Sequence, residues 1–219
     1  MPFKDRSEAG RRLAAALDRY TDTDAIVLAL PRGGVPVAAE VAAHLNAPLD
    51  LILVRKLGLP GQRELAMGAA VDGAGAAVVR NEAVIRAAGV STAEFERVRL
   101  AEMQEIERRR ERYLAGRKPL DLTGRTVIVV DDGIATGATV RAAVGGLRQR
   151  GAGRIVIATP VAPPDVVIEL RKEADDVVCL EQPEDFGAIG FYYRDFRQLS
   201  DEEVTAALQP FQTAPGTKA

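Results

Sequence analysis

Short apolar runs alternate with alanine-rich stretches of helical period along most of the chain. Most of these runs contain too little polar alternation for one face to meet water, which is typical of strands buried on both faces. The pattern predicts strands at residues 25–30, 49–54, 125–130, 154–159 and 176–180, and helices at residues 35–45, 138–150 and 164–173. This order of elements predicts an α/β fold with a doubly wound, mostly parallel sheet and flanking helices.

Residues 72–124 interrupt the alternation and are expected to form a helical insert. Ser91 and Glu94 have the spacing of a capping box, which predicts a helix from Thr92 to about Leu114. Acidic and basic residues are nearly balanced on it, which favours a solvated face with local ion pairs over a nucleic-acid-binding arm. Its narrow apolar stripe is expected to form a helical cap or a subunit contact: Phe95, Val98, Met103, Ile106 and Tyr113.

The C-terminal part carries a second capping box, Ser200 with Glu203, which predicts a short terminal helix. Residues 1–210 are expected to form a single domain, and residues 211–219 a disordered tail.

Composition narrows the classes of function. The chain has 219 residues, 47% of them hydrophobic, and a net charge of -2, so it can bury a core and has no overall positive field for nucleic acid. The single cysteine, Cys179, excludes an internal disulfide, and with one histidine, His44, no ordinary zinc cluster is expected. No apolar run has the length of a membrane span, so we expect a cytoplasmic protein without a membrane partner.

The stretch VVDDGIATGAT, residues 129–139, follows a predicted strand and enters a predicted helix. The N–H groups and the dipole of a helix N-terminus favour an anion such as phosphate. A glycine in the loop lets the backbone approach the anion closely, and the threonine hydroxyls can donate to it. The predicted phosphate-binding residues are Ala135, Thr136, Gly137, Ala138 and Thr139.

The adjacent Asp131 and Asp132 would repel that phosphate, so they must face another part of the ligand. Carboxylates accept hydrogen bonds well from neighbouring hydroxyls, so the motif predicts a sugar phosphate with its ribose diol on the acids. The alternative is that the aspartates only cap the turn and the helix.

The same stretch resembles the phosphoribosyl-pyrophosphate (PRPP) motif of the type I phosphoribosyltransferases. LPRGGVP, residues 30–36, resembles the pyrophosphate loop of that family, which would place Arg32, Gly33 and Gly34 on the leaving group. VRKLGLPG, residues 54–61, resembles the segment that often carries basic residues for pyrophosphate. The loops that follow residues 25–30 and 125–130 should lie on one rim, because ligands of such sheets gather at the carboxyl ends of the strands.

The resemblance implies transfer of the 5-phosphoribosyl group from PRPP to a nitrogenous base or a related heterocycle, with pyrophosphate released and Mg²⁺ as cofactor. Arg55 and Lys56 would be catalytic by stabilising the departing pyrophosphate, and Asp131, Asp132 and Asp195 would lie near the metal. The resemblance also leads us to expect a homodimer.

The acceptor stays open. Residues 181–200 are expected to form a hood over the base, with Phe186 stacking on it, although its aromatic residues could instead close the core or an interface. Ala135 stands where 6-oxopurine enzymes usually carry an acid, and Gly133 replaces a usual aliphatic residue. Two other functions also stay open: a non-catalytic PRPP-binding regulator, and a phosphate-binding or hydrolytic module for another sugar phosphate.

Overall fold

The computed structural model describes residues 2–72 and 77–211, apart from the side chains of residues 63 and 64. Most of the predicted tail, residues 212–219, therefore lies outside the described residues.

The core is a five-stranded parallel sheet in the order β2-β1-β6-β7-β8. Its strands are β1 (Ile26–Ala29), β2 (Leu49–Leu51), β6 (Thr126–Val130), β7 (Arg154–Val161) and β8 (Asp176–Glu181). All five lie where the apolar runs predict them, although the strand predicted at residues 49–54 ends at Leu51. The parallel, doubly wound α/β architecture is confirmed.

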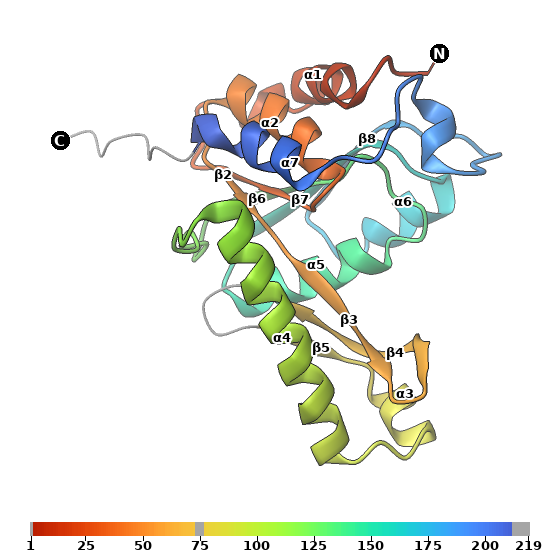
Figure 1. Ribbon diagram of the computed structural model, residues 1–219. Helices are drawn as coiled ribbons and strands as arrows, with labels where there is room; N and C mark the ends of the chain where they lie inside the picture. Colours follow the sequence, from red (N-terminus) through yellow and green to blue (C-terminus); the bar gives the residue numbers. More distant parts are fainter. Residues whose placement is uncertain (1, 73–76, 212–219) are drawn as a thin grey trace.

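Helices cover both faces of this sheet (Figure 1). One face carries α1 (Arg6–Ala16), α2 (Gly34–Leu45) and α7 (Asp201–Leu208), and the other carries α5 (Ala138–Gln149) and α6 (Pro164–Leu170). Alternate strand residues serve the two faces, as the period of two requires: Val27 packs with α1 and α2, whereas Leu28 packs with α5 and α6. Short 3-10 turns complete the chain: η1 (Asp18–Tyr20), η2 (Ile189–Tyr192) and η3 (Gln209–Phe211).

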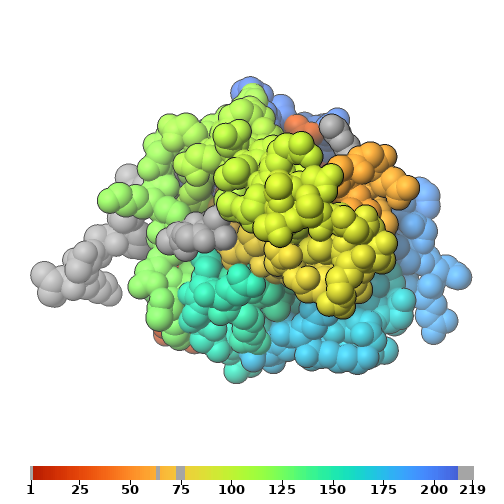
Figure 2. All heavy atoms as spheres, turned by 90° about the horizontal axis from the view of Figure 1, so that it is seen from below, coloured from red at the N-terminus to blue at the C-terminus, as the bar shows by residue number. Residues whose placement is uncertain are grey.

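A second unit, which we call the arm, projects from the core (Figure 1). It contains an antiparallel sheet of β3 (Val54–Leu59), β4 (Gln62–Val71) and β5 (Ala77–Arg80), followed by α3 (Glu82–Ala87) and α4 (Thr92–Leu114). In the view from below, α3 and the start of α4, in yellow, lie in front of the core (Figure 2). The helical insert predicted at 72–124 contains α3 and α4, but the arm already begins at β3, and residues 77–80 form the strand β5.

Helix α4 has the predicted bounds and a complete capping box, with Ser91 accepting from the Glu94 amide. Its stripe is covered within the chain: Phe95, Ile106 and Tyr113 are buried in the core cluster that also holds Leu57 and Met67 of the arm sheet. These three residues of the stripe therefore form an intramolecular cap, as one of the two predictions expected.

Two glycines bring the arm close to the core. A Cβ at Gly145 would lie 2.9 Å from the Val79 side chain, and one at Gly146 would lie 2.7 Å from that of Val71. These absent side chains let α5 lie directly against β4 and β5. None of the helices in the described ranges is long and apolar enough to span a bilayer.

Candidate active site

The winding of the sheet changes direction between β1 and β6. These strands are neighbours, yet the chain leaves β1 for α2 on one face and β6 for α5 on the other. The loops at their carboxyl ends separate there, which makes this point the usual ligand crevice of open α/β sheets. Both predicted motifs, residues 30–34 and 131–139, lie at this point.

The two motifs touch. The Leu30 amide donates to the Val130 carbonyl at 2.9 Å. A Cβ at Gly34 would lie 2.6 Å from the same carbonyl oxygen, and one at Gly33 would overlap the Asp132 carboxylate. Only glycine fits at either position, so the predicted pyrophosphate loop packs directly on the acidic pair. The Pro31–Arg32 peptide bond is cis.

Asp131 is half-buried and Asp132 is buried. The Asp131 carboxylate accepts the Asp132 amide at 2.9 Å. Burial and the neighbouring Asp132 carboxylate raise the pKa of Asp131 well above its ordinary value. Burial also raises the pKa of Asp132, against the opposing effect of Arg6. Hydroxyl donors or a cation beside these two acids would stabilise their ionised form.

The Asp132 carboxylate is held by Arg6, a residue that the sequence did not single out. Arg6 Nε donates to Asp132 Oδ2 at 2.7 Å, and both side chains are only 10% exposed. The Tyr193 hydroxyl donates to the Asp132 carbonyl at 2.5 Å. No local signal marks Arg6, because its partner is 126 positions away and an arginine at the start of a polar helix is usually solvated.

The predicted phosphate loop leads into α5 through Gly137, which has a left-handed φ of 72°. Ala135, Thr136, Ala138 and Thr139 are exposed around it, so this helix N-terminus is open to a ligand.

Arg141, in the first turn of α5, is a second residue that the sequence analysis missed. Its Nη2 donates to the Thr136 carbonyl at 2.6 Å and places a cation beside the loop. The helical period gives a signal for it, since Arg141 lies four positions after Gly137.

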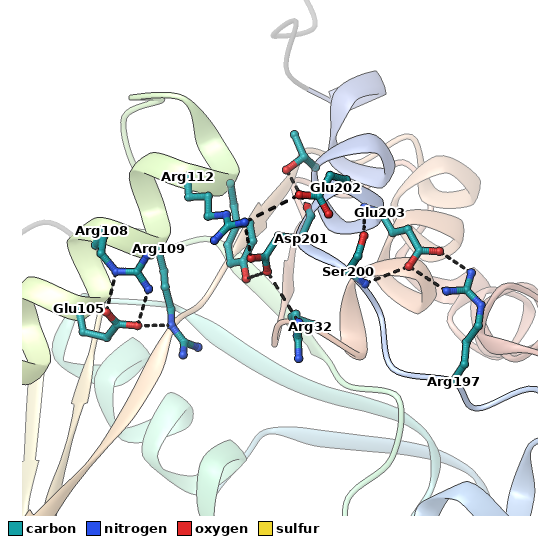
Figure 3. A network of polar contacts seen from close by, with 12 residues as sticks. Arg32, Glu105, Arg108, Arg109, Arg112, Arg197, Ser200, Asp201, Glu202 and Glu203 are labelled. Atoms are coloured by element: carbon teal, nitrogen blue, oxygen red, sulfur yellow. Dashed lines mark hydrogen bonds and ion pairs between the residues drawn. The ribbon is translucent and has the colours of Figure 1, made fainter.

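Arg32 points from the predicted pyrophosphate loop toward the junction of α4 and α7 (Figure 3). Its Nη1 lies 3.9 Å from Asp201 Oδ1. That oxygen accepts the Tyr113 hydroxyl at 2.6 Å, while Oδ2 lies 2.8 Å from Arg112 Nη2. These partners, the Tyr113 hydroxyl first, lower the pKa of Asp201, so the acid that faces Arg32 is ionised.

Arg55 and Lys56 are neighbours on β3 and differ in their surroundings. Arg55 Nε donates to Glu102 Oε2 of α4 at 2.7 Å. Lys56 lines a groove of about 690 Å³ between the arm and α5, whose wall also includes Ala138 and Thr139 of the phosphate loop. Lys56 therefore shares a groove with the phosphate loop, whereas Arg55 is held by α4.

The predicted hood lies beside the acidic pair. Ile189 occupies the space where residue 133 would carry a Cβ, so Gly133 allows the hood to close on the turn after Asp132. The Phe186 ring stacks on Tyr192 with centroids 5.6 Å apart, and Phe191 is 76% exposed.

Asp195 does not join the acidic pair. Its carboxylate accepts the Arg197 amide at 3.2 Å, on the exposed side of the hood. Over the described ranges, no three acidic, histidine or cysteine side chains form a group that could hold a metal. These three aspartates therefore form no common cluster within the described ranges, and their place near a metal stays a prediction.

Fold and site together define a family, and comparison with known proteins identifies it. Residues 74–196, more than half of the chain, match the model of the phosphoribosyl transferase domain. The chain belongs to the phosphoribosyl transferase family.

Three relatives show how far the similarity extends. A candidate phosphoribosyl transferase of Mycobacterium tuberculosis is 48% identical over 206 residues, which cover 94% of this chain and 46% of the relative. The chain thus spans about half the length of the curated relatives that it matches along most of its length. The crystal structure of TT1426 from Thermus thermophilus is 43% identical, with a TM-score of 0.84, over 96% of this chain and 99% of that one. Uracil phosphoribosyltransferase of Clostridioides difficile is 42% identical over 59 residues, covering 27% of this chain and 28% of that enzyme.

Proposed function

We propose that the protein transfers the 5-phosphoribosyl group of PRPP to a nitrogen of a base or related heterocycle and releases pyrophosphate. One observation carries the proposal: Gly33 and Gly34 pack against the Asp131–Asp132 turn at the point where the sheet changes its winding. A single ligand at this crevice can therefore reach a phosphate loop, a pair of carboxylates and a pyrophosphate loop at once.

Each part of PRPP has a matching group. The 5-phosphate would bind the N–H groups of residues 135–139 at the start of α5. The ribose hydroxyls would donate to the acidic pair and so offset the burial that raises the pKa values of both acids. The pyrophosphate would lie on Gly33 and Gly34, with Arg32, Arg55 and Lys56 as its cations.

In this reaction the bond from the anomeric carbon to the pyrophosphate oxygen breaks, and a bond to the acceptor nitrogen forms. The ribose ring gains positive charge as the leaving group departs with its electron pair, by analogy with other glycosyl transfers. The protein would act by holding the two reactants in line and by stabilising the pyrophosphate with fixed cations and backbone N–H groups.

Mg²⁺ fits this site through Asp131. The ion binds hard oxygen atoms and commonly takes one or two carboxylates together with substrate phosphates. Asp131 is half-buried and, within the part of the chain that the structure describes, forms no ion pair, whereas Asp132 is paired with Arg6 and Asp195 lies apart. Bound Mg²⁺ would neutralise part of the pyrophosphate charge.

The acceptor would lie between the phosphate loop and the hood. Phe186 and Tyr192 form a stacked pair there that could extend onto a flat heterocycle. The Ala135 side chain cannot exchange a proton with the base. We therefore expect an acceptor whose transfer needs no acidic residue at this position.

The test is calorimetric titration with PRPP and Mg²⁺, followed by a pyrophosphate-release screen over purines, pyrimidines and related heterocycles. We expect binding, and release with at least one acceptor. Asp131→Asn should weaken PRPP binding at least about tenfold, whereas Asp121→Asn, at the opposite end of β6, should not. Binding without release from any acceptor would instead support a PRPP-binding regulator, and absence of binding would refute both functions.

A further inference from the structure

Arg6 joins three parts of the molecule that are distant in the sequence. It opens α1, donates from Nε to Asp132 Oδ2 at 2.7 Å, and donates from Nη1 to the Arg197 carbonyl at 3.0 Å. Its guanidinium carbon also lies 4.1 Å from the centre of the Phe196 ring. A single side chain thus connects the N-terminal helix, the hood and the acidic pair.

The backbone around Arg6 makes the N-terminal segment part of the hood. The Phe3 amide donates to the Tyr192 carbonyl at 2.7 Å, and the Arg194 amide returns a bond to the Phe3 carbonyl at 2.8 Å. The Tyr193 ring lies between those of Phe3 and Phe196, with centroids 5.4 and 5.0 Å away. Tyr193 then donates its hydroxyl to the Asp132 carbonyl.

Because of these contacts, Asp131 and Asp132 differ in their bonding partners and in their exposure. Asp132 is bound by Arg6 at its carboxylate and by Tyr193 at its carbonyl, and only 7% of it is exposed. Asp131 is more exposed, and among the described residues its carboxylate has a hydrogen bond from the Asp132 amide but no ion pair.

We propose that Arg6 is a positioning residue. It binds Asp132, which then holds the hood in place, so that Asp131 is the carboxylate that accepts hydrogen bonds from the ribose hydroxyls. This inference rests on the proposed function and assigns different tasks to its two acids. Arg6 itself touches no substrate. It fixes the position of the hood and the orientation of the acidic pair.

The experiment measures PRPP affinity by calorimetry and backbone hydrogen exchange of residues 189–197 in the full chain. The variants are Arg6→Gln, Arg6→Lys, Asp131→Asn, Asp132→Asn and the two double variants that combine Arg6→Gln with each aspartate change. Arg12→Gln is the matched control, because Arg12 lies on the same helix, stacks on Phe3 at 4.5 Å and pairs with an acid, Glu181, away from the acidic pair.

We expect Arg6→Gln to weaken PRPP binding about tenfold, the size of a lost hydrogen bond to a charged group, and to speed exchange of residues 189–197. Arg6→Lys should recover part of both losses. The Arg6→Gln and Asp132→Asn losses should fall well short of additivity, because both remove the same contact. The losses of Arg6→Gln and Asp131→Asn should come closer to additivity, because Arg6 and Asp131 share no direct contact. Arg12→Gln should bind PRPP like the wild type.

Three results would overturn the inference: unchanged affinity and exchange in Arg6→Gln, additive losses with Asp132→Asn, or equal losses in Arg6→Gln and Arg12→Gln. A wild-type protein that does not bind PRPP would refute the proposed function instead. In that case the hydrogen-exchange measurement alone tests the positioning role of Arg6. Faster exchange in Arg6→Gln but not in Arg12→Gln supports its positioning role, and equal exchange in the two removes it.

Discussion

At the scale of single residues, the site depends on positions where a side chain is missing. Gly133 is buried directly after the acidic pair, and Ile189 of the hood fills the space beside its Cα atom. Packed interiors accept little added volume, so substitutions at Gly133 and Ile189 test how tightly the hood packs on the acidic pair.

Gly133→Ala should destabilise the fold by about 1–3 kcal/mol, the usual cost of overpacking. Ile189→Ala should relieve the clash, so the double variant should be more stable than the sum of the two single losses predicts. Urea denaturation of the three variants measures this coupling. Strictly additive losses would show that Ile189 and residue 133 do not compete for the same space.

The only cysteine gives a second prediction at this scale. Burial raises the pKa of the Cys179 thiol from 9.0 to about 11. Because the thiolate is the reactive form, alkylation at pH 8 should be about 100-fold slower in the folded protein than in denaturant. The raised pKa favours the folded state below pH 9, and this contribution should be lost as the pH rises toward 11. Mass spectrometry of iodoacetamide labelling tests the rate, and similar rates in both states would contradict it.

Local sequence marks some residues of the candidate site but not others. Residues 30–34 and 131–139 each carry their chemistry within one loop, so a motif reveals them. Arg6 and Tyr193 reach Asp132 from 126 and 61 positions away, and nothing near either residue indicates that partner. Asp195 was expected near the metal by resemblance, yet its carboxylate accepts a backbone amide within the hood.

At the scale of elements, α4 and the arm sheet show what periodicity can and cannot predict. The capping boxes gave the starts of α4 and α7, because each lies within four residues of chain. Strands β3 to β5 escaped prediction because β4 is rich in Ala and Gly and poor in β-branched residues. Helices that are distant in the sequence stabilise them: α4 packs against β3, and α5 packs against β4 and β5.

A buried charge cluster fixes α4 to the core. Arg110 lies 3.1 Å from Asp50 and 2.7 Å from Asp72, and all three residues are at most 7% exposed. Arg110→Met should cost about 3–5 kcal/mol, because it leaves two buried carboxylates without their cation.

The matched control is Arg108→Ala, whose solvent-exposed pair with Glu105 should contribute little to stability. Burial raises the pKa of Asp72 against the opposing effect of Arg110, so removing Arg110 should raise it further. The deficit should therefore shrink as the pH falls toward about 4 and this acid takes up a proton. Urea denaturation at several pH values measures this trend. A loss in Arg110→Met no larger than that in Arg108→Ala would contradict the anchoring role.

At the scale of the whole molecule, Asp201 is the meeting point of the arm, the core and the C-terminal helix. It accepts from Tyr113, pairs with Arg112 and faces Arg32 of the pyrophosphate loop (Figure 3). The arm and the C-terminal helix therefore both act on the cation that the proposed function assigns to the leaving group.

Asp201→Asn should strengthen pyrophosphate binding about two- to fivefold, because Arg32 would no longer share its charge with an ionised carboxylate; half-exposed pairs of this kind are worth up to about 1 kcal/mol. Glu202→Gln is the control, since Glu202 is the adjacent acid and lies 3.8 Å from the same Arg112. Calorimetry with pyrophosphate and Mg²⁺ tests the change. Weaker binding in Asp201→Asn would mean that Asp201 orients Arg32 for the ligand instead of competing with it.

The contacts of Asp132 also determine when the parts of the site can assemble during translation. Chains emerge from the ribosome N-terminus first, so Arg6 and the acidic pair are present well before Tyr193. A nascent chain that has just completed β8 can form its five-stranded sheet, but it has no Tyr193 hydroxyl or Ile189 side chain to close the turn after Asp132. The crevice is thus finished only when residues 189–193 have been translated, and a chain that stalls before them would carry the acidic pair without its hood.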